Sequence, residues 1–244
     1  DAATGAGSAT LDRIRDAAGD RAEIGGRIAQ TRDITRAIYA AFPWMFALIA
    51  VLTFALLMRA LRSWLLPLKA VLLNVLSIGA AWGVVVLVWQ RGGLSEAIWG
   101  IPATDAITNW IPLAIFAFLY GLSMDYEVFI LSRVREGWDA TGSTREAVVF
   151  GLGRTGRLVT SAALILVCAF VALAASPGTE IKILATGLAV GILLDATVVR
   201  ALVVPALVML LGRLNWVLPP GAARLVRARP SPRETGVSRS AGGR

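Results

Sequence analysis

The sequence has no histidine and a single cysteine, and these absences remove several kinds of chemistry. Acid–base catalysis by histidine, metal sites built from histidine and cysteine, dithiol redox centres and intrachain disulfides are excluded or nearly so. No nucleophile–base set is visible either, so we expect no enzyme activity, no metal and no cofactor. The lone Cys168 lies in a hydrophobic run and is interpreted as a small packing residue.

Charged residues are also scarce. They make up 16% of the chain, against about 25% in soluble domains, whereas 57% of the residues are hydrophobic. Each of five charge-poor stretches is long enough to cross a bilayer core of about 30 Å as a helix of about 20 residues. The sequence therefore predicts an all-α polytopic membrane protein with five spans, at approximately 40–59, 67–90, 108–132, 157–176 and 181–211.

The formal net charge of +8 follows a membrane topology rather than a nucleic-acid-binding pattern. Basic residues cluster after the first, third and fifth spans, whereas the connections after the second and fourth spans carry one each, Arg91 and Lys182. The positive-inside rule places the three clusters in the cytoplasm. We therefore expect a multi-pass protein of the plasma membrane, with its N-terminus outside and its C-terminus cytoplasmic.

The chain divides into three parts. Residues 1–36 are polar, and a short soluble helix is expected around 11–28, before the break at Gly25-Gly26. Residues 37–213 hold the five spans, and residues 214–244 are predicted to be a disordered basic tail. An outside N-terminus normally follows a signal peptide or an earlier span, and the chain begins with Asp, so we interpret it as the C-terminal part of a longer protein.

Local signals predict where several helices begin and end. Pro67 and Pro112 are expected in first turns, where a missing amide hydrogen costs nothing. Ser143 and Glu146 have the capping-box spacing, which predicts a short helix ending near Gly151 and lying along the inner membrane surface. The sequence Ser-Pro-Gly-Thr at 176–179 predicts a tight turn, so the fourth and fifth spans should form an antiparallel hairpin.

Two aspartates lie within the expected spans. Placing an ionisable group at the centre of a membrane helix costs about 2.5 to 3.5 kcal/mol of insertion free energy. Each aspartate must therefore have a compensating structural or functional role. Asp125 follows Gly121 at a spacing of four, and Asp195 follows Gly187 and Gly191 in the same way. Each acid thus shares a helix face with small residues that favour close packing, and we expect both acids to face protein.

A carboxyl in a water-poor site can exchange a proton near cellular pH, particularly beside a hydroxyl such as that of Tyr126. For Asp195 a purely structural role stays an equal alternative, with Arg200 as its partner. Residues five apart on an α-helix are separated by about 140°, so we expect Arg200 to extend to the inner interface rather than to pair with Asp195. Glu127 points away from Asp125 and is expected to be solvated or interfacial.

The segment around the first acid resembles a known family. Residues 121–136, Gly-Leu-Ser-Met-Asp-Tyr-Glu-Val-Phe-Ile-Leu-Ser-Arg-Val-Arg-Glu, closely resemble the signature of the MMPL transporters of the resistance-nodulation-division superfamily. Residues 154–157 and 191–200, and Gly25-Gly26 with Asp33, fit the same family. The resemblance implies twelve spans in two repeats, each with an extracytoplasmic porter domain, of which this chain holds the end of the second porter domain and spans eight to twelve.

The resemblance also implies a function. Asp-Tyr pairs on the fourth and tenth helices of the family relay protons, which power the export of lipids or other hydrophobic molecules. Asp125 and Tyr126 match the tenth-helix pair, with Asp195 as a possible auxiliary. The partners expected are a hydrophobic substrate, protons, and a missing N-terminal repeat or a partner membrane protein. The alternative is a non-transporting membrane scaffold that pairs with another membrane protein through the Gly187/Gly191 face.

Overall fold

The computed structural model describes residues 25–219, together with Gly221 and six positions before residue 20. The short helix expected around 11–28 lies mostly outside the described residues, as does the basic tail beyond Pro219. The folded part extends at least to Asn215 and Trp216, which are buried against the rest of the chain.

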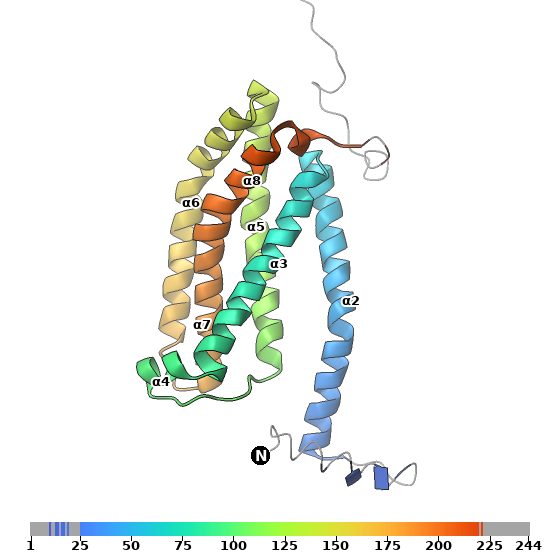
Figure 1. The fold of residues 1–244 in the computed structure, drawn as a ribbon, viewed down its shortest axis with the longest axis vertical. Helices are drawn as coiled ribbons and strands as arrows, with labels where there is room; N and C mark the ends of the chain where they lie inside the picture. The colour runs from blue at the N-terminus through green and yellow to red at the C-terminus, as the bar shows by residue number, and fades with distance from the viewer. Residues whose placement is uncertain are drawn as a thin grey trace, which may run out of the picture.

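The described residues form long helices and contain no strand (Figure 1). In chain order the elements are α2 (Arg27–Leu61), α3 (Leu65–Val85), a π-helical segment (Val86–Gln90), α4 (Gly93–Trp99), α5 (Trp110–Thr141), α6 (Thr144–Leu173), α7 (Thr179–Leu194), a second π-helical segment (Asp195–Val203), α8 (Val204–Leu211) and a 3₁₀ turn (Gly212–Trp216).

Local sequence signals explain several helix ends. Pro67 and Pro112 lie in the first turns of α3 and α5. The Ser143 hydroxyl accepts a hydrogen bond of 3.4 Å from the Glu146 backbone N–H at the start of α6, which confirms the predicted cap. Gly142 has a φ of 71°, a left-handed conformation that glycine adopts without a steric penalty, and it ends α5.

The prediction of a separate short helix ending near Gly151 is wrong, because α6 is continuous from Thr144 to Leu173. Gly151 instead allows α6 to approach α5 closely. A Cβ added at Gly151 would lie 2.3 Å from Val134 Cγ2 and 2.9 Å from the Val134 backbone nitrogen. The glycine therefore marks a helix crossing rather than a helix end.

Five helices among the described residues are long and apolar enough to cross a membrane: Ala29–Leu61, Leu65–Gln90, Trp110–Thr141, Thr144–Leu173 and Thr179–Trp216. The last of these combines α7, the second π-helical segment, α8 and the 3₁₀ turn. The chain is an all-α polytopic membrane protein, as its sequence indicates. Figure 1 shows α3, α5, α6 and the α7–α8 helix packed together, with α2 at one side of the bundle.

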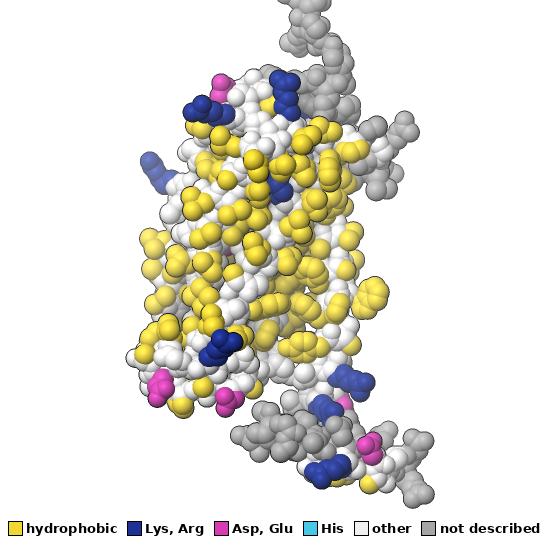
Figure 2. Space-filling model, in the orientation of Figure 1, with side chains coloured by type: hydrophobic (Ala, Val, Ile, Leu, Met, Phe, Trp, Pro, Cys, Tyr) yellow, Lys and Arg dark blue, Asp and Glu magenta, His cyan; other side chains and the backbone are white. Residues whose placement is uncertain are grey.

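The two ends of the bundle differ in charge. The α2–α3 and α5–α6 connections and the end of α8 lie together at the end drawn at the top of Figure 1. We call this the basic end, because Arg62, Arg145 and Arg213 belong to it. Hydrophobic side chains cover the middle of the face shown in Figure 2, and most of its charged side chains lie toward the two ends. That the basic end is cytoplasmic stays a prediction.

Candidate functional site

A buried ion pair lies near the middle of the last long helix. Asp195 Oδ2 accepts a hydrogen bond of 2.8 Å from Arg200 Nε, and the two residues are 9% and 5% exposed. The expectation that Arg200 extends to the interface is therefore wrong. The reason is local: residues 195–203 are π-helical, and a π-helix bonds residues five apart, which brings the side chains at i and i+5 closer together around the helix than in an α-helix.

Neighbouring helices complete the surroundings of this pair. Ser77 of α3 donates a hydrogen bond of 3.2 Å to Asp195 Oδ1. From α5, the Ser123 carbonyl accepts a hydrogen bond from Arg200 Nη2, and the Ser123 hydroxyl is 2.7 Å from the same nitrogen. The guanidinium also lies over the Tyr126 ring, 5.4 Å from its centroid. Three helices therefore meet at one internal charge pair.

An internal cavity adjoins the pair and is lined by Tyr126, Asp195, Arg200 and Asn74, among other residues. Within the described part of the chain, two buried polar atoms of this lining, Asn74 Oδ1 and Arg200 Nη1, have no hydrogen-bond partner. Most buried polar atoms in proteins are paired, so these two atoms identify an interior with spare hydrogen-bonding capacity.

Asp125 lies on a different face of α5. Its side chain is exposed, and it forms no hydrogen bond or ion pair with any other described residue. Sequence analysis expects both aspartates to face other helices; within the described chain this holds for Asp195 and not for Asp125. Gly121, one turn away on the same face, is also exposed, and an added Cβ there would meet no atom within 4 Å.

Glu127 occupies the opposite face, and the expectation that it is solvated is wrong. Two residues along a helix correspond to a rotation of about 200°, so Asp125 and Glu127 point in nearly opposite directions. Glu127 is 6% exposed and lines a cavity with Lys69 of α3 and Val208 of α8. Of these two acids, Glu127 is therefore the one that faces the bundle of this chain.

Gly187 and Gly191 lie where α7 packs against α3 and α5. An added Cβ would be 2.6 Å from Ile115 Cδ1 at Gly187 and 2.4 Å from Leu119 Cδ1 at Gly191. Small side chains at these positions bring three helices close enough for Asp195, one turn beyond Gly191, to reach its partners.

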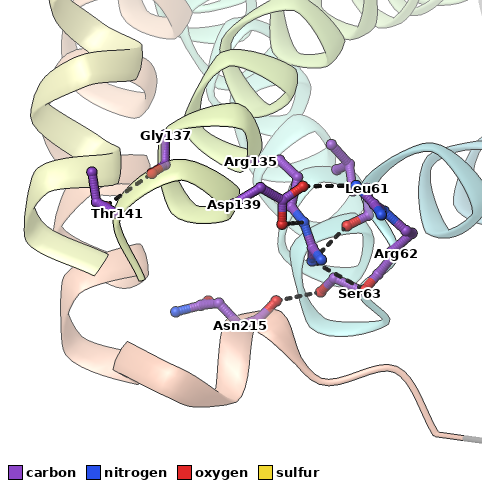
Figure 3. A network of polar contacts seen from close by, with 8 residues as sticks. All are labelled: Leu61, Arg62, Ser63, Arg135, Gly137, Asp139, Thr141 and Asn215. Atoms are coloured by element: carbon purple, nitrogen blue, oxygen red, sulfur yellow. Dashed lines mark hydrogen bonds and ion pairs between the residues drawn. The ribbon is translucent and has the colours of Figure 1, made fainter. Parts of the chain in front are cut away.

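A polar network at the basic end fixes the ends of several helices (Figure 3). Arg135 of α5 is 4% exposed, donates a hydrogen bond of 3.0 Å to the Leu61 carbonyl and forms an ion pair of 3.2 Å with Asp139. Arg62 pairs with the other carboxylate oxygen of Asp139 at 2.7 Å. Figure 3 also shows Ser63, whose hydroxyl donates to the Asn215 carbonyl at 2.6 Å. This network links the end of α2, the α2–α3 connection, α5 and the 3₁₀ turn.

Sequence reasoning did not identify two members of the interior, Ser77 and Lys69 of α3. Both are single polar residues within or beside apolar runs. Their eight-residue spacing was the available signal, because such a spacing places side chains on one broad helix face.

Comparison with known proteins identifies relatives along nearly the whole chain. The sequence model of the MMPL family matches residues 1–233. The mycolic acid-containing lipids exporter MmpL11 of Mycolicibacterium smegmatis is 40% identical over 197 residues, which cover 81% of this chain and 20% of the relative. The heme uptake protein MmpL11 of Mycobacterium tuberculosis is 38% identical over 216 residues, covering 88% of this chain and 22% of the relative.

A third relative is the trehalose monomycolate exporter MmpL3 of Mycobacterium tuberculosis, 37% identical over 202 residues, which cover 83% of this chain and 21% of the relative. The chain thus spans about a fifth of the length of these relatives. The family match together with the five long apolar helices leads to one conclusion: the chain belongs to the MMPL family of membrane transporters.

Proposed function

We propose that this chain supplies one half of the intramembrane proton relay of an exporter driven by the proton-motive force. Asp125 is the proton carrier, Tyr126 its hydrogen-bonding partner and Asp195 an auxiliary group. The observation that carries the proposal is the arrangement around Arg200, whose guanidinium contacts both the Tyr126 ring and the Asp195 carboxylate. A change of charge at either group is felt by the other through this cation.

The exposed face of α5 supports the assignment of Asp125. A carboxyl in the middle of a membrane helix costs about 2.5 to 3.5 kcal/mol when it meets only lipid, so it requires a protein partner or a proton. The MMPL repeat missing from this chain is the partner that the family resemblance implies. Gly121 leaves room on the same face for a closely packed helix.

The driving force is sufficient for such a device. One proton moving down a potential of about 100 mV releases about 2.3 kcal/mol, and each unit of pH gradient adds about 1.4 kcal/mol. The cargo class we propose is lipids or other hydrophobic molecules, exported across the plasma membrane. Two of the relatives above are named as exporters of such lipids, and the third is named for heme uptake.

The alternative is a non-transporting scaffold that pairs with another membrane protein through Gly187 and Gly191. That face of α7 is covered by α3 and α5 of the same chain. A scaffold would have to use another surface, and no specific observation favours one.

The test uses the complete protein that contains this chain, reconstituted in liposomes with an imposed proton gradient. Asp125→Asn should abolish both proton influx and cargo movement, because asparagine cannot carry a proton. Glu136→Gln is the control, since Glu136 lies on the same helix and is exposed. Normal export by the Asp125→Asn protein would refute the role assigned to Asp125.

A further inference from the structure

Glu127 is a buried carboxyl that the relay described above does not use. Within the described residues its side chain forms no hydrogen bond and no ion pair, although it is only 6% exposed. A buried carboxylate without a partner is costly, whereas a carboxyl that holds a proton is far less so. The site therefore favours a group that binds and releases a proton.

Glu127 also lies on a polar stripe of α5. Ser123, Glu127, Leu131 and Arg135 follow at intervals of four residues, which correspond to about 6 Å of rise at each step, and all four are buried. Ser123 contacts Arg200 at the central ion pair, and Arg135 belongs to the network at the basic end. Glu127 thus lies between the centre and the basic end, and Leu131 separates it from Arg135.

Charged groups face Glu127 from two other elements. Lys69 of α3 lines the same cavity, and Asp195 and Arg200 of the π-helical segment act on Glu127 electrostatically. The contribution of α8 to this cavity is apolar, from Val204, Leu207 and Val208. A proton on Glu127 therefore changes the field at the central pair.

Lys69 is held by a different partner. Its ammonium group donates a hydrogen bond to the side-chain oxygen of Asn215. The Asn215 amide nitrogen donates in turn to the carbonyls of Val208 and Gly212, at 2.7 and 2.8 Å. Lys69 and Glu127 form no ion pair within 4.0 Å in the described chain, so Lys69 is placed to influence the carboxyl without neutralising it by direct contact.

We propose that Glu127 is a second proton-carrying residue, which connects the central Asp195–Arg200 pair to water at the basic end. The inference rests on the proposed function. The O–H bond of a protonated Asp195 carboxyl breaks as an O–H bond forms on the Glu127 carboxylate, since Arg200 cannot release a proton. The Glu127 O–H bond then breaks when a water molecule at the basic end takes the proton and becomes hydronium. Each transfer breaks one O–H bond and forms one, so no oxidant or reductant is needed.

The experiment measures proton influx with a pH-sensitive dye in liposomes that contain the complete protein. Glu127→Gln keeps the size of the side chain and removes its proton-carrying carboxyl, so proton influx should fall by about tenfold or more. The matched control is Glu136→Gln, the same substitution at an exposed position of α5, which should leave influx within about twofold of the parent. Normal influx through the Glu127→Gln protein overturns the inference.

A double substitution separates proton carriage from simple charge balance. If Glu127 only balanced the charge of Lys69, then Glu127→Gln combined with Lys69→Gln would restore influx, and that result overturns the inference. If Glu127 carries the proton, the double variant stays as inactive as Glu127→Gln.

Glu127→Asp keeps a carboxyl group at this position, and it provides the test if the Glu127→Gln protein does not fold. Its influx should reach part or all of the parent level, because the carboxyl is kept. A folded Glu127→Asp protein with influx no higher than that of Asp125→Asn overturns the inference. The Asp125→Asn variant tests the proposed function separately from the role of Glu127. Influx lost with Asp125→Asn but retained with Glu127→Gln refutes only the role of Glu127, whereas influx retained with both refutes the relay itself.

Discussion

Removing one member of the Asp195–Arg200 pair should destabilise the protein more than removing both. Asp195→Asn leaves the Arg200 guanidinium buried without a counter-charge, and breaking a buried pair in this way costs about 3 to 5 kcal/mol. The remaining contacts of Arg200, with Ser123 and the Tyr126 ring, are to uncharged groups and cannot neutralise it. Arginine cannot lose its proton in a protein, so the penalty persists.

Arg200→Gln should cost less, about 1 to 3 kcal/mol, because the carboxyl that remains can become neutral by binding a proton. The double variant Asp195→Asn/Arg200→Gln contains no buried charge at this site and should lie within about 1 kcal/mol of the parent. Asp105→Asn is the matched control. Asp105 is exposed, and its left-handed φ of 53° is one that asparagine also adopts, so the control should change stability by less than about 0.5 kcal/mol.

The measurement is unfolding in mixed micelles with increasing SDS, followed by tryptophan fluorescence, with export measured in parallel. If the pair is purely structural, the double variant recovers export together with stability. If Asp195 also carries a proton, the double variant recovers stability alone. Equal losses for Asp195→Asn and for its control would refute the reasoning, because they would show that Arg200 is not buried as a charge.

Two further predictions concern how the helices are built. Gly151→Ala should destabilise the protein by about 1 to 3 kcal/mol, because its Cβ would lie 2.9 Å from the Val134 backbone, whereas Gly153→Ala on the same helix meets no atom within 4 Å and should be neutral or stabilising. SDS unfolding of the two variants compares them directly, and a ranking in the opposite order would contradict the close crossing of α5 and α6. Ser143→Ala removes the cap of α6 and should lower the stability of that helix end by about 1 kcal/mol. The change is measured as faster amide hydrogen exchange in the first turn of α6, and unchanged exchange would show that the cap contributes nothing.

The fold was largely predictable, since its signals are strong and local. Long uncharged runs, prolines in first turns and the Ser143 cap each have a single physical interpretation, and the structure agrees with them. Gly151 was misread because a glycine in a polar stretch can either end a helix or permit a close crossing. Only the position of Val134 on another helix decides between the two.

The site was less predictable, because its members come from separate helices. The pairing of Asp195 with Arg200 depends on a π-helical stretch, and an ideal α-helix of the same sequence would separate the two side chains by about 140°. Whether Asp125 or Glu127 faces the bundle also depends on where the neighbouring helices lie, which the local sequence does not specify. Small residues such as Gly121 mark a packing face, but they do not say whether the partner helix lies in this chain.

The placement of two acids on opposite faces of α5 has a mechanical consequence. Asp125 and Glu127 are separated by about 3 Å of rise along the helix, so a rigid movement of α5 displaces both together. Asp125 faces the surface available to another part of the protein, whereas Glu127 faces α3 and α8. A movement of α5 as a unit would therefore transmit a change on one face to packing on the other. The Arg135 network ties the basic end of α5 to the end of α2, so such a movement must strain this network or carry it along (Figure 3).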